Sequence, residues 1–157
     1  MQTNESPVNT KHVVGRRDVH YSSLDEMLED ARRVSSDKVR TLGNWTPGQI
    51  FAHLAQSLDS SIDGSDFALP MPVRWLLILV MKRKFFTQSI PAGFTTSATY
   101  IPPATSVADG ISMLEKAVTR QKQESSRATH PGFGKISRDE WNDFHLRHAE
   151  LHMSFIV

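Results

Sequence analysis

Apolar residues recur at helical spacing in several separate segments of the chain. The first segment starts after Ser23, which together with Glu26 matches the S-x-x-E capping box that opens many helices. Its apolar positions are three or four residues apart: Leu24, Met27, Leu28, Ala31 and Val34. This spacing places them on one face of a helix, so the pattern predicts a helix over roughly Ser23–Ser35.

A second helix is predicted from Thr46 to about Gly64. Thr46 is the expected N-cap, Pro47 occupies the first helical position, and Gln49 completes a capping box. Its apolar stripe advances in steps of four: Ile50, Leu54, Leu58 and Ile62. Gly64 is typical of the residue that ends a helix.

The third segment, "PMPVRWLLILVMKRKFF", predicts a helix that begins near Pro70–Pro72. It is apolar nearly all round, which indicates burial on more than one side. Lys82, Arg83 and Lys84 would suit the negative C-terminal end of this helix. Contact of this basic run with a membrane or RNA is the weaker alternative. Partial exposure of the apolar face in a homodimer is favoured over it.

The remaining segments complete an all-helical pattern. Residues 88–105 contain four Pro and Gly breaks and predict a long ordered loop or crossover. A fourth helix follows over residues 106–123, then a turn at residues 127–135. The last helix begins at another capping box, Ser137 with Glu140. Five helices, no convincing strand and one crossover predict an all-α bundle.

Composition narrows the class of protein. The chain has 157 residues, 39% hydrophobic and 22% charged, which is typical of one soluble globular domain. Residues 1–15 are polar and without periodicity, so we expect a flexible N-terminal arm followed by a single domain over residues 16–157. A net charge of +1 gives no electrostatic argument for nucleic-acid binding.

Location and metal chemistry follow from two further features. The first twenty residues lack the apolar stretch of a signal peptide, and the longest apolar run, Trp75–Met81, is too short to span a bilayer. We therefore expect a cytoplasmic protein with no membrane partner. The chain has no cysteine, so any metal would be held by His, Asp or Glu.

The last helix carries an unusual number of histidines, in the stretch "WNDFHLRHAELHMSF". At about 100° per residue, His148 falls inside the apolar stripe, His152 just beside it and His145 on its margin. His148 and His152 are one turn apart on one face, a spacing at which two imidazoles can bind one ion. The pair of His145 and His148 is the weaker alternative.

A third ligand would have to come from elsewhere in the chain. His12 and His20 lie outside the predicted bundle and His130 lies in a turn, whereas His53 lies on the second predicted helix. His53 is therefore the candidate third ligand. Alternatively, these histidines are hydrogen-bonded core residues without a metal. A thermolysin-like mechanism is not supported, because Ala149 stands where the zincin general base would follow the first histidine.

Three segments resemble the DinB-like four-helix metalloprotein superfamily, and within it the branch called domain of unknown function 1569. They are "LGNWTPGQIFAHLAQSLDSSIDG", "IPAGF" and "HPGFGKISRDEWNDFHLRHAELHMSF". The resemblance covers roughly residues 16–157. It implies an up-down-down-up bundle with a crossover, a homodimer, and a divalent ion held by His53, His148 and His152. His145 would be an additional partner of a ligand, a proton shuttle or an alternate ligand.

The resemblance also implies a range of activities. Characterised relatives are metal-dependent thiol transferases, a thiol-dependent isomerase and hydrolases, so the three-histidine site would activate water or a low-molecular-weight thiol. Zinc or nickel are the first expectations for the ion, with iron or copper as alternatives. The last motif reads "HAELHMSF", where many relatives have His followed by Arg-Gly-Gln, so no particular thiol chemistry follows. The substrate and the catalytic base are not indicated, and a non-catalytic metal- or ligand-binding bundle is the alternative function.

Overall fold

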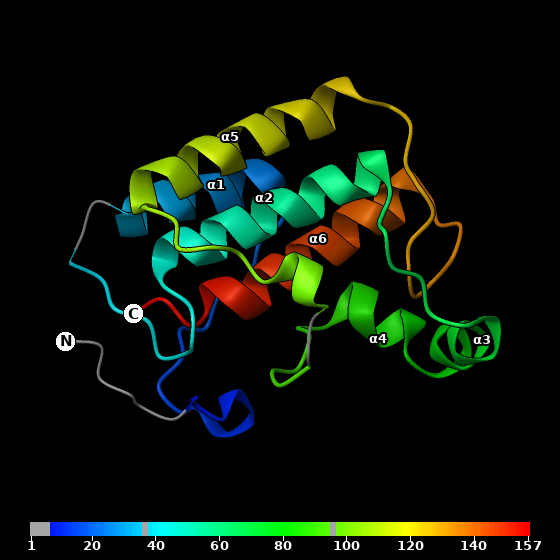
Figure 1. The fold of residues 1–157 in the computed structure, drawn as a ribbon, viewed down its shortest axis with the longest axis horizontal. Coiled ribbons are helices and arrows are strands. Elements are labelled where there is room, and N and C mark those ends of the chain that lie inside the picture. The colour runs from blue at the N-terminus through cyan, green and yellow to red at the C-terminus, as the bar shows by residue number, and fades with distance from the viewer. Residues whose placement is uncertain (1–6, 36–37, 95–96) are drawn as a thin grey trace.

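The computed structural model describes residues 7–35, 38–94 and 97–157, and over these residues the chain is helical without a strand. The described residues form six α-helices, and Figure 1 shows how they are arranged and connected. The α-helices are α1 (Leu24–Ser35), α2 (Pro47–Asp63), α3 (Met71–Val80), α4 (Lys82–Thr87), α5 (Val107–Gln123) and α6 (Arg138–Met153). Two short 3-10 helices are η1 (Thr10–His12) and η2 (Ala98–Tyr100). The predicted all-α class is confirmed for the described residues.

The main core lies between the four longest helices. Helix α2 packs against α5 and α6, and α1 packs against the same two helices. The predicted stripes supply Met27, Leu28, Ala31 and Val34 of α1 and Ile50, Leu54 and Leu58 of α2, all of which are buried. Phe51 and Met153, outside those stripes, are also fully buried. The periodicity of the sequence therefore identified the buried faces of α1 and α2 correctly.

Helix starts follow the capping signals of the sequence. Thr46 and Gln49 form a reciprocal capping box at α2, and Ser137 and Glu140 form another at α6. At α1 the hydroxyl of Ser23 accepts a bond from the Glu26 amide, but the Glu26 carboxylate accepts from the neighbouring Ser22 amide instead of completing the box. These caps fix where α2 and α6 begin, and thus the register of the histidines along both helices.

The crossover between α4 and α5 is tied to α2 by side-chain amides. Gln49 donates to the carbonyl of Pro102 at 3.1 Å, and Gln56 donates to the carbonyl of Thr99 at 2.8 Å. The short helix η2 lies against α2 as a result. The predicted long loop over residues 88–105 is thus an ordered connection at its described residues, while Thr95 and Thr96 lie outside them.

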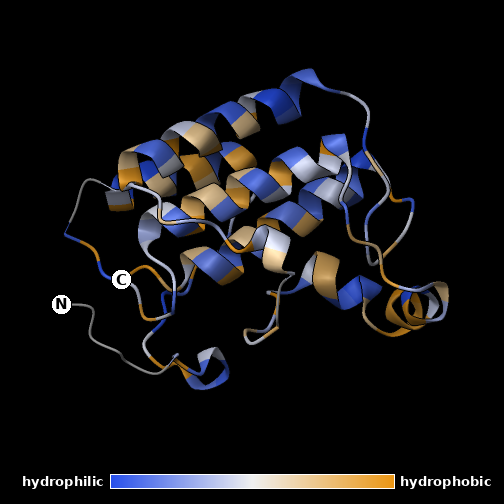
Figure 2. Cartoon of the chain, viewed as in Figure 1, coloured by the Kyte–Doolittle hydropathy of each residue, from blue (hydrophilic) through white to orange (hydrophobic). Residues whose placement is uncertain are grey.

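The expectation for the third predicted helix was wrong in two respects. It is split at Met81, so the basic run Lys82–Lys84 begins α4 instead of ending α3. Helix α3 also has no buried residue: Trp75 is 70% exposed and Leu79 is 85% exposed. Figure 2 shows α3 as an apolar element at the periphery. Among the described residues, no helix combines the length and apolar character that crossing a bilayer requires.

The described part of the N-terminal segment contacts the loop before α2. The amide of Val8 donates to the Asn44 side-chain oxygen at 2.7 Å, and the Asn44 side-chain amide donates back to the Val8 carbonyl at 3.0 Å. Further on, the Arg17 amide bonds to the carbonyl of Ser154 at the end of α6. The flexible arm stays a prediction, and residues 1–6 lie outside the described part.

A smaller core cluster beneath α4 contains two buried histidines. His145 is only 3% exposed and stacks on Trp141 at 5.3 Å, so its expected place on the margin of the stripe was wrong. His130 is 6% exposed, and its Nδ1 accepts bonds from the amides of Gly132 and Phe133. Loss of solvation on burial lowers the pKa of each imidazole to about 3. Both rings are therefore neutral in the folded protein.

These buried rings predict that the metal-free protein loses stability on mild acidification. In the unfolded chain each histidine takes up a proton below about pH 6.5, whereas the folded state excludes that proton until about pH 3. Between pH 6.5 and 5, each such histidine lowers the free energy of unfolding with a slope approaching about 1.4 kcal/mol per pH unit. His145→Gln should reduce the slope, measured by denaturant unfolding, by one such increment. His12→Gln, at an exposed position, should keep the wild-type slope; equal slopes for all three proteins would contradict this account.

Candidate metal centre

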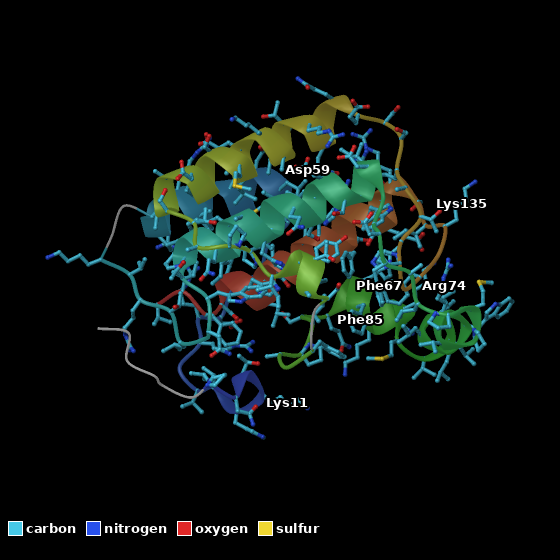
Figure 3. All side chains as sticks on the ribbon, viewed as in Figure 1. Lys11, Asp59, Phe67, Arg74, Phe85 and Lys135 are labelled. Atoms are coloured by element: carbon cyan, nitrogen blue, oxygen red, sulfur yellow. The ribbon has the colours of Figure 1, made fainter. Side chains whose placement is uncertain are left out.

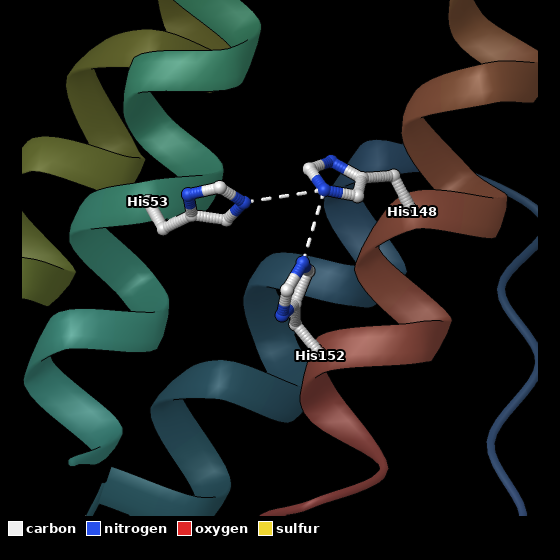
Figure 4. Close-up of side chains that lie close together, drawn as sticks. All are labelled: His53, His148 and His152. Carbon is white, nitrogen blue, oxygen red and sulfur yellow. Dashed lines mark hydrogen bonds between the residues drawn. The ribbon is translucent and has the colours of Figure 1, made fainter. Parts of the chain in front are cut away.

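Three imidazoles from two helices meet at one point between α2 and α6. The Nε2 of His148 lies 3.2 Å from the Nε2 of His53 and 3.0 Å from the Nε2 of His152, as Figure 4 shows. One ligand atom from each ring lies within 4.8 Å of the other two. The structure thus brings together the three histidines that the sequence nominated. Within the described residues, His145 is not part of this group.

The orientation of His53 is fixed by the crossover. Its Nδ1 lies 2.8 Å from the backbone carbonyl of Tyr100, an atom that can only accept a hydrogen bond. The proton of neutral His53 is therefore on Nδ1, and the lone pair of Nε2 faces the other two rings. A ring nitrogen held by a backbone carbonyl is the usual arrangement behind a metal-ligating histidine. Nothing in the sequence pointed to Tyr100, because its contribution is a main-chain atom of a loop.

His148 is held from two sides. Its Nδ1 lies 3.3 Å from the hydroxyl of Ser57, and its ring stacks on Phe144 at 5.6 Å with 19° between the planes. Ser57 and Gln56 lie about one helical turn beyond His53 on α2. The structure assigns Ser57 to the ring of His148, whereas Gln56 bonds to the crossover.

Hydrogen bonding among the rings alone leaves the cluster incompletely satisfied. Because His53 presents a lone pair, a bond to His148 requires the proton of neutral His148 to sit on Nε2. That single proton must then be shared between the Nε2 atoms of His53 and His152. If the proton sits on Nδ1 instead, the lone pairs of His148 and His53 face each other at 3.2 Å. No neutral combination gives both contacts a full hydrogen bond, whereas a cation would accept all three lone pairs.

Burial keeps the three rings neutral. Loss of solvation is the main cause that lowers the pKa of His53, and it lowers the pKa of His148 and His152 still further. The neighbouring imidazoles oppose protonation of His148 and His152 as well. Neutral imidazoles are the form that binds metals, so the environment favours a cation over protons. Three such donors suit zinc, nickel, iron or copper.

Among the residues that the structure describes, no carboxylate takes part in the cluster. Glu150, the acidic residue between His148 and His152 in sequence, is 2% exposed and pairs with Arg147 at 2.7 Å. It also accepts a bond from the amide of Tyr21 at 2.9 Å. This agrees with the prediction that it is not placed as the general base of a zincin. Asp143 is exposed, and Glu140 completes the capping box of α6 that the sequence predicted.

The three histidines line a cavity of about 420 Å³. The cavity is bounded by the loop before α2, by α4, by the crossover and by α6. Trp45 covers two of the rings: its centroid lies 4.7 Å from that of His53, and it stacks on His152 at 5.4 Å with 15° between the planes. A ligand in this cavity would reach the side of the cluster that the protein leaves open.

Comparison with known proteins gives a family without an assigned activity. No curated protein and no solved structure matches the chain. The sequence profile of the family described as "Protein of unknown function (DUF1569)" matches residues 13–157, which include all three histidines of the cluster. Because this match extends over nearly the whole chain, the protein belongs to the DUF1569 family.

Proposed function

We propose that this protein is a divalent-metal-dependent enzyme in which His53, His148 and His152 hold the ion. The observation that carries the proposal is the convergence of three Nε2 atoms that cannot satisfy one another as neutral rings. Three protein ligands and one open position are the usual composition of a catalytic zinc site. The cavity beside the three histidines provides space for that fourth position.

The bound ion would supply a Lewis acid that lowers the pKa of a coordinated water or thiol. The chain itself supplies orientation and exclusion of water. The Tyr100 carbonyl and the Ser57 hydroxyl hold the rings of His53 and His148. Trp45 shields His53 and His152 on the side of the loop before α2. Hydrolysis or transfer to a thiol is the reaction class that such a site supports, within a DinB-like arrangement of the four long helices.

A non-catalytic metal- or ligand-binding role is the second candidate, and one observation favours it. Among the described residues, none of those lining the cavity is Asp, Glu, Lys or Arg. The only general-base candidates there are therefore the histidines, which the metal would engage. Turnover of a panel of esters and activated thiol acceptors by the metal-loaded protein distinguishes the two roles.

Removal of one histidine should abolish the metal site. We expect the wild-type protein to bind about one zinc ion per chain, and His148→Ala to bind at least about 100-fold more weakly because it removes the central ligand. Elemental analysis and calorimetric titration with zinc measure this. His12→Ala, at an exposed position, should bind zinc as the wild type does. Stoichiometric zinc in both variants would contradict the proposal.

The Ser57 hydroxyl, which contacts the Nδ1 of His148, should increase the affinity for zinc without itself binding the ion. Ser57→Ala removes the partner of the His148 Nδ1 and should weaken zinc binding by about tenfold. Ser60→Ala is a matched control on the same helix, because its hydroxyl bonds only to the Gln56 carbonyl, and it should leave the affinity unchanged. Equal zinc affinities for the two variants would show that Ser57 has no orienting role.

We also propose that the chain forms a homodimer through α3. Its outer surface combines Trp75, Leu76 and Leu79, all more than 60% exposed. Arg74, the single charged residue of α3, is directed to the loop at Gly134. An uncharged apolar face is self-complementary, as a two-fold interface requires, and a patch of this kind is rare on a monomer surface.

This proposal predicts that Leu79→Glu dissociates the dimer. Each copy would bring an unpaired carboxylate into the interface, so we expect dimerisation at least about tenfold weaker than in the wild type. Sedimentation velocity over a concentration series measures the effect. Val14→Glu, at a position 87% exposed and outside α3, is the control that should remain dimeric. A wild-type protein that is monomeric at all concentrations would rule the interface out.

A further inference from the structure

The cavity beside the histidines has the size of a small-molecule site. Its volume of about 420 Å³ lies within the range of roughly 300–1,000 Å³ found for cavities that bind metabolites and drug-sized ligands. Its walls come from segments far apart in the sequence, from Thr10 near the N-terminus to Phe155 after α6. A ligand bound here would have one end at the histidine cluster and the remainder against these walls.

The walls are dominated by aromatic side chains. Five rings that are not histidines line the cavity: Trp45, Phe85, Phe94, Phe144 and Phe155. Phe85 of α4, labelled in Figure 3, and Phe94 of the crossover are 5.7 Å apart and tilted by 57°. A planar aromatic group could pack against such tilted rings in the edge-to-face or offset geometry that aromatic pairs prefer.

The polar groups of the walls offer little to a charged ligand. Lys, Arg, Asp and Glu are absent from the described lining residues. The side chain of Asn44 is engaged through both its oxygen and its nitrogen with the backbone of Val8. The remaining side-chain hydrogen-bonding groups are the Thr10 hydroxyl, the Trp45 indole and the histidines themselves. Lys11 and Arg16 contact the lining residues Gly93 and Phe155 but do not line the cavity themselves. A charged group buried away from the histidines would therefore lose its hydration without a counter-ion among the described lining side chains, which is costly.

We propose that the cavity selects a small molecule with an uncharged, aromatic body and a single metal-binding head. This inference rests on the proposed function for the head group, which coordinates the ion at the histidine cluster. The body packs between Phe85, Phe94 and Trp45. Substrates and thiols whose bodies carry several carboxylates or ammonium groups are selected against.

The test uses zinc-loaded protein and three hydroxamic acids that share the same metal-binding head. 4-Phenylbutanohydroxamic acid has the apolar body, 4-(4-carboxyphenyl)butanohydroxamic acid adds one carboxylate at its far end, and acetohydroxamic acid has the head alone. We expect the phenyl compound to bind at least about tenfold more tightly than either of the others in calorimetric titrations. Equal affinity for the three compounds would overturn the proposal.

A change of selectivity tests the location of the body. Phe94 is 60% exposed at the cavity wall, so Phe94→Lys should fold and place an ammonium group where the carboxylated ring ends. We expect this variant to bind the carboxylated compound at least about tenfold more tightly than the wild type does. Phe67→Lys, a 44% exposed phenylalanine that does not line the cavity, should show no gain. An equal gain in affinity for the carboxylated compound in both variants, or no gain in Phe94→Lys, would show that the aromatic body of the ligand does not lie beside Phe94.

An experiment without metal separates this inference from the proposed function. Metal-free protein is titrated with 4-phenyl-1-butanol and with 4-(4-hydroxybutyl)benzoate, which share the same hydroxyl head and differ only in the carboxylate at the far end of the body. Binding of the phenyl alcohol but not of the benzoate supports the uncharged cavity, even if the protein proves unable to bind zinc. Zinc binding together with equal affinity for these two compounds would leave the metal site intact and reject the selectivity.

Discussion

The functional interpretation depends on one constraint: three imidazole nitrogens with too few protons between them. His53 is obliged by the Tyr100 carbonyl to present a lone pair, and His148 has one proton for two neighbours. Protonation of a ring would supply the missing hydrogen-bond donor, but burial opposes it because it lowers the pKa of all three imidazoles. The packing of α2 against α6 holds the two helices that carry the rings together, and a cation would satisfy all three lone pairs, as the proposed function requires.

The crossover between α4 and α5 holds His53 in the orientation that presents its Nε2 lone pair to the other two rings. Gln49 and Gln56 of α2 bind its carbonyls, which holds η2 where Tyr100 can reach His53. The same segment supplies Phe94 and Ile101 to the walls of the cavity. Orientation of the first ligand and the shape of the space beside it thus come from one piece of chain, which explains why a long connection is ordered in a compact domain.

Features with a local cause could be predicted from the sequence. The starts of α2 and α6 follow from capping boxes a few residues long, and the buried faces of α1 and α2 follow from the period of one helical turn. Selection of His53 together with His148 and His152 worked for the same reason. Each histidine lies on a helix whose inward face was already evident, so the packing of two such faces brings the rings together.

Features that depend on distant partners could not be predicted. Apolar residues all round α3 indicated burial, but periodicity does not tell whether another element covers a face, and within the described residues none buries this helix. The Tyr100 carbonyl carries no side-chain signal. His145 appeared marginal on a helical wheel, yet the loop at residues 130–136 and α4 enclose that side of α6.

The buried histidines differ in the hydrogen-bond partners that the protein gives them. His130 is equally buried, but its Nδ1 receives two backbone amides, so hydrogen bonds within the protein account for it. Among the described residues, the three Nε2 atoms at the cavity have one another as hydrogen-bond partners instead of backbone amides. An unsatisfied buried polar atom costs on the order of 1–3 kcal/mol, and aliphatic side chains there would avoid that cost. This contrast supports the proposal that the three histidines bind a cation, which a ligand in the cavity beside them could reach.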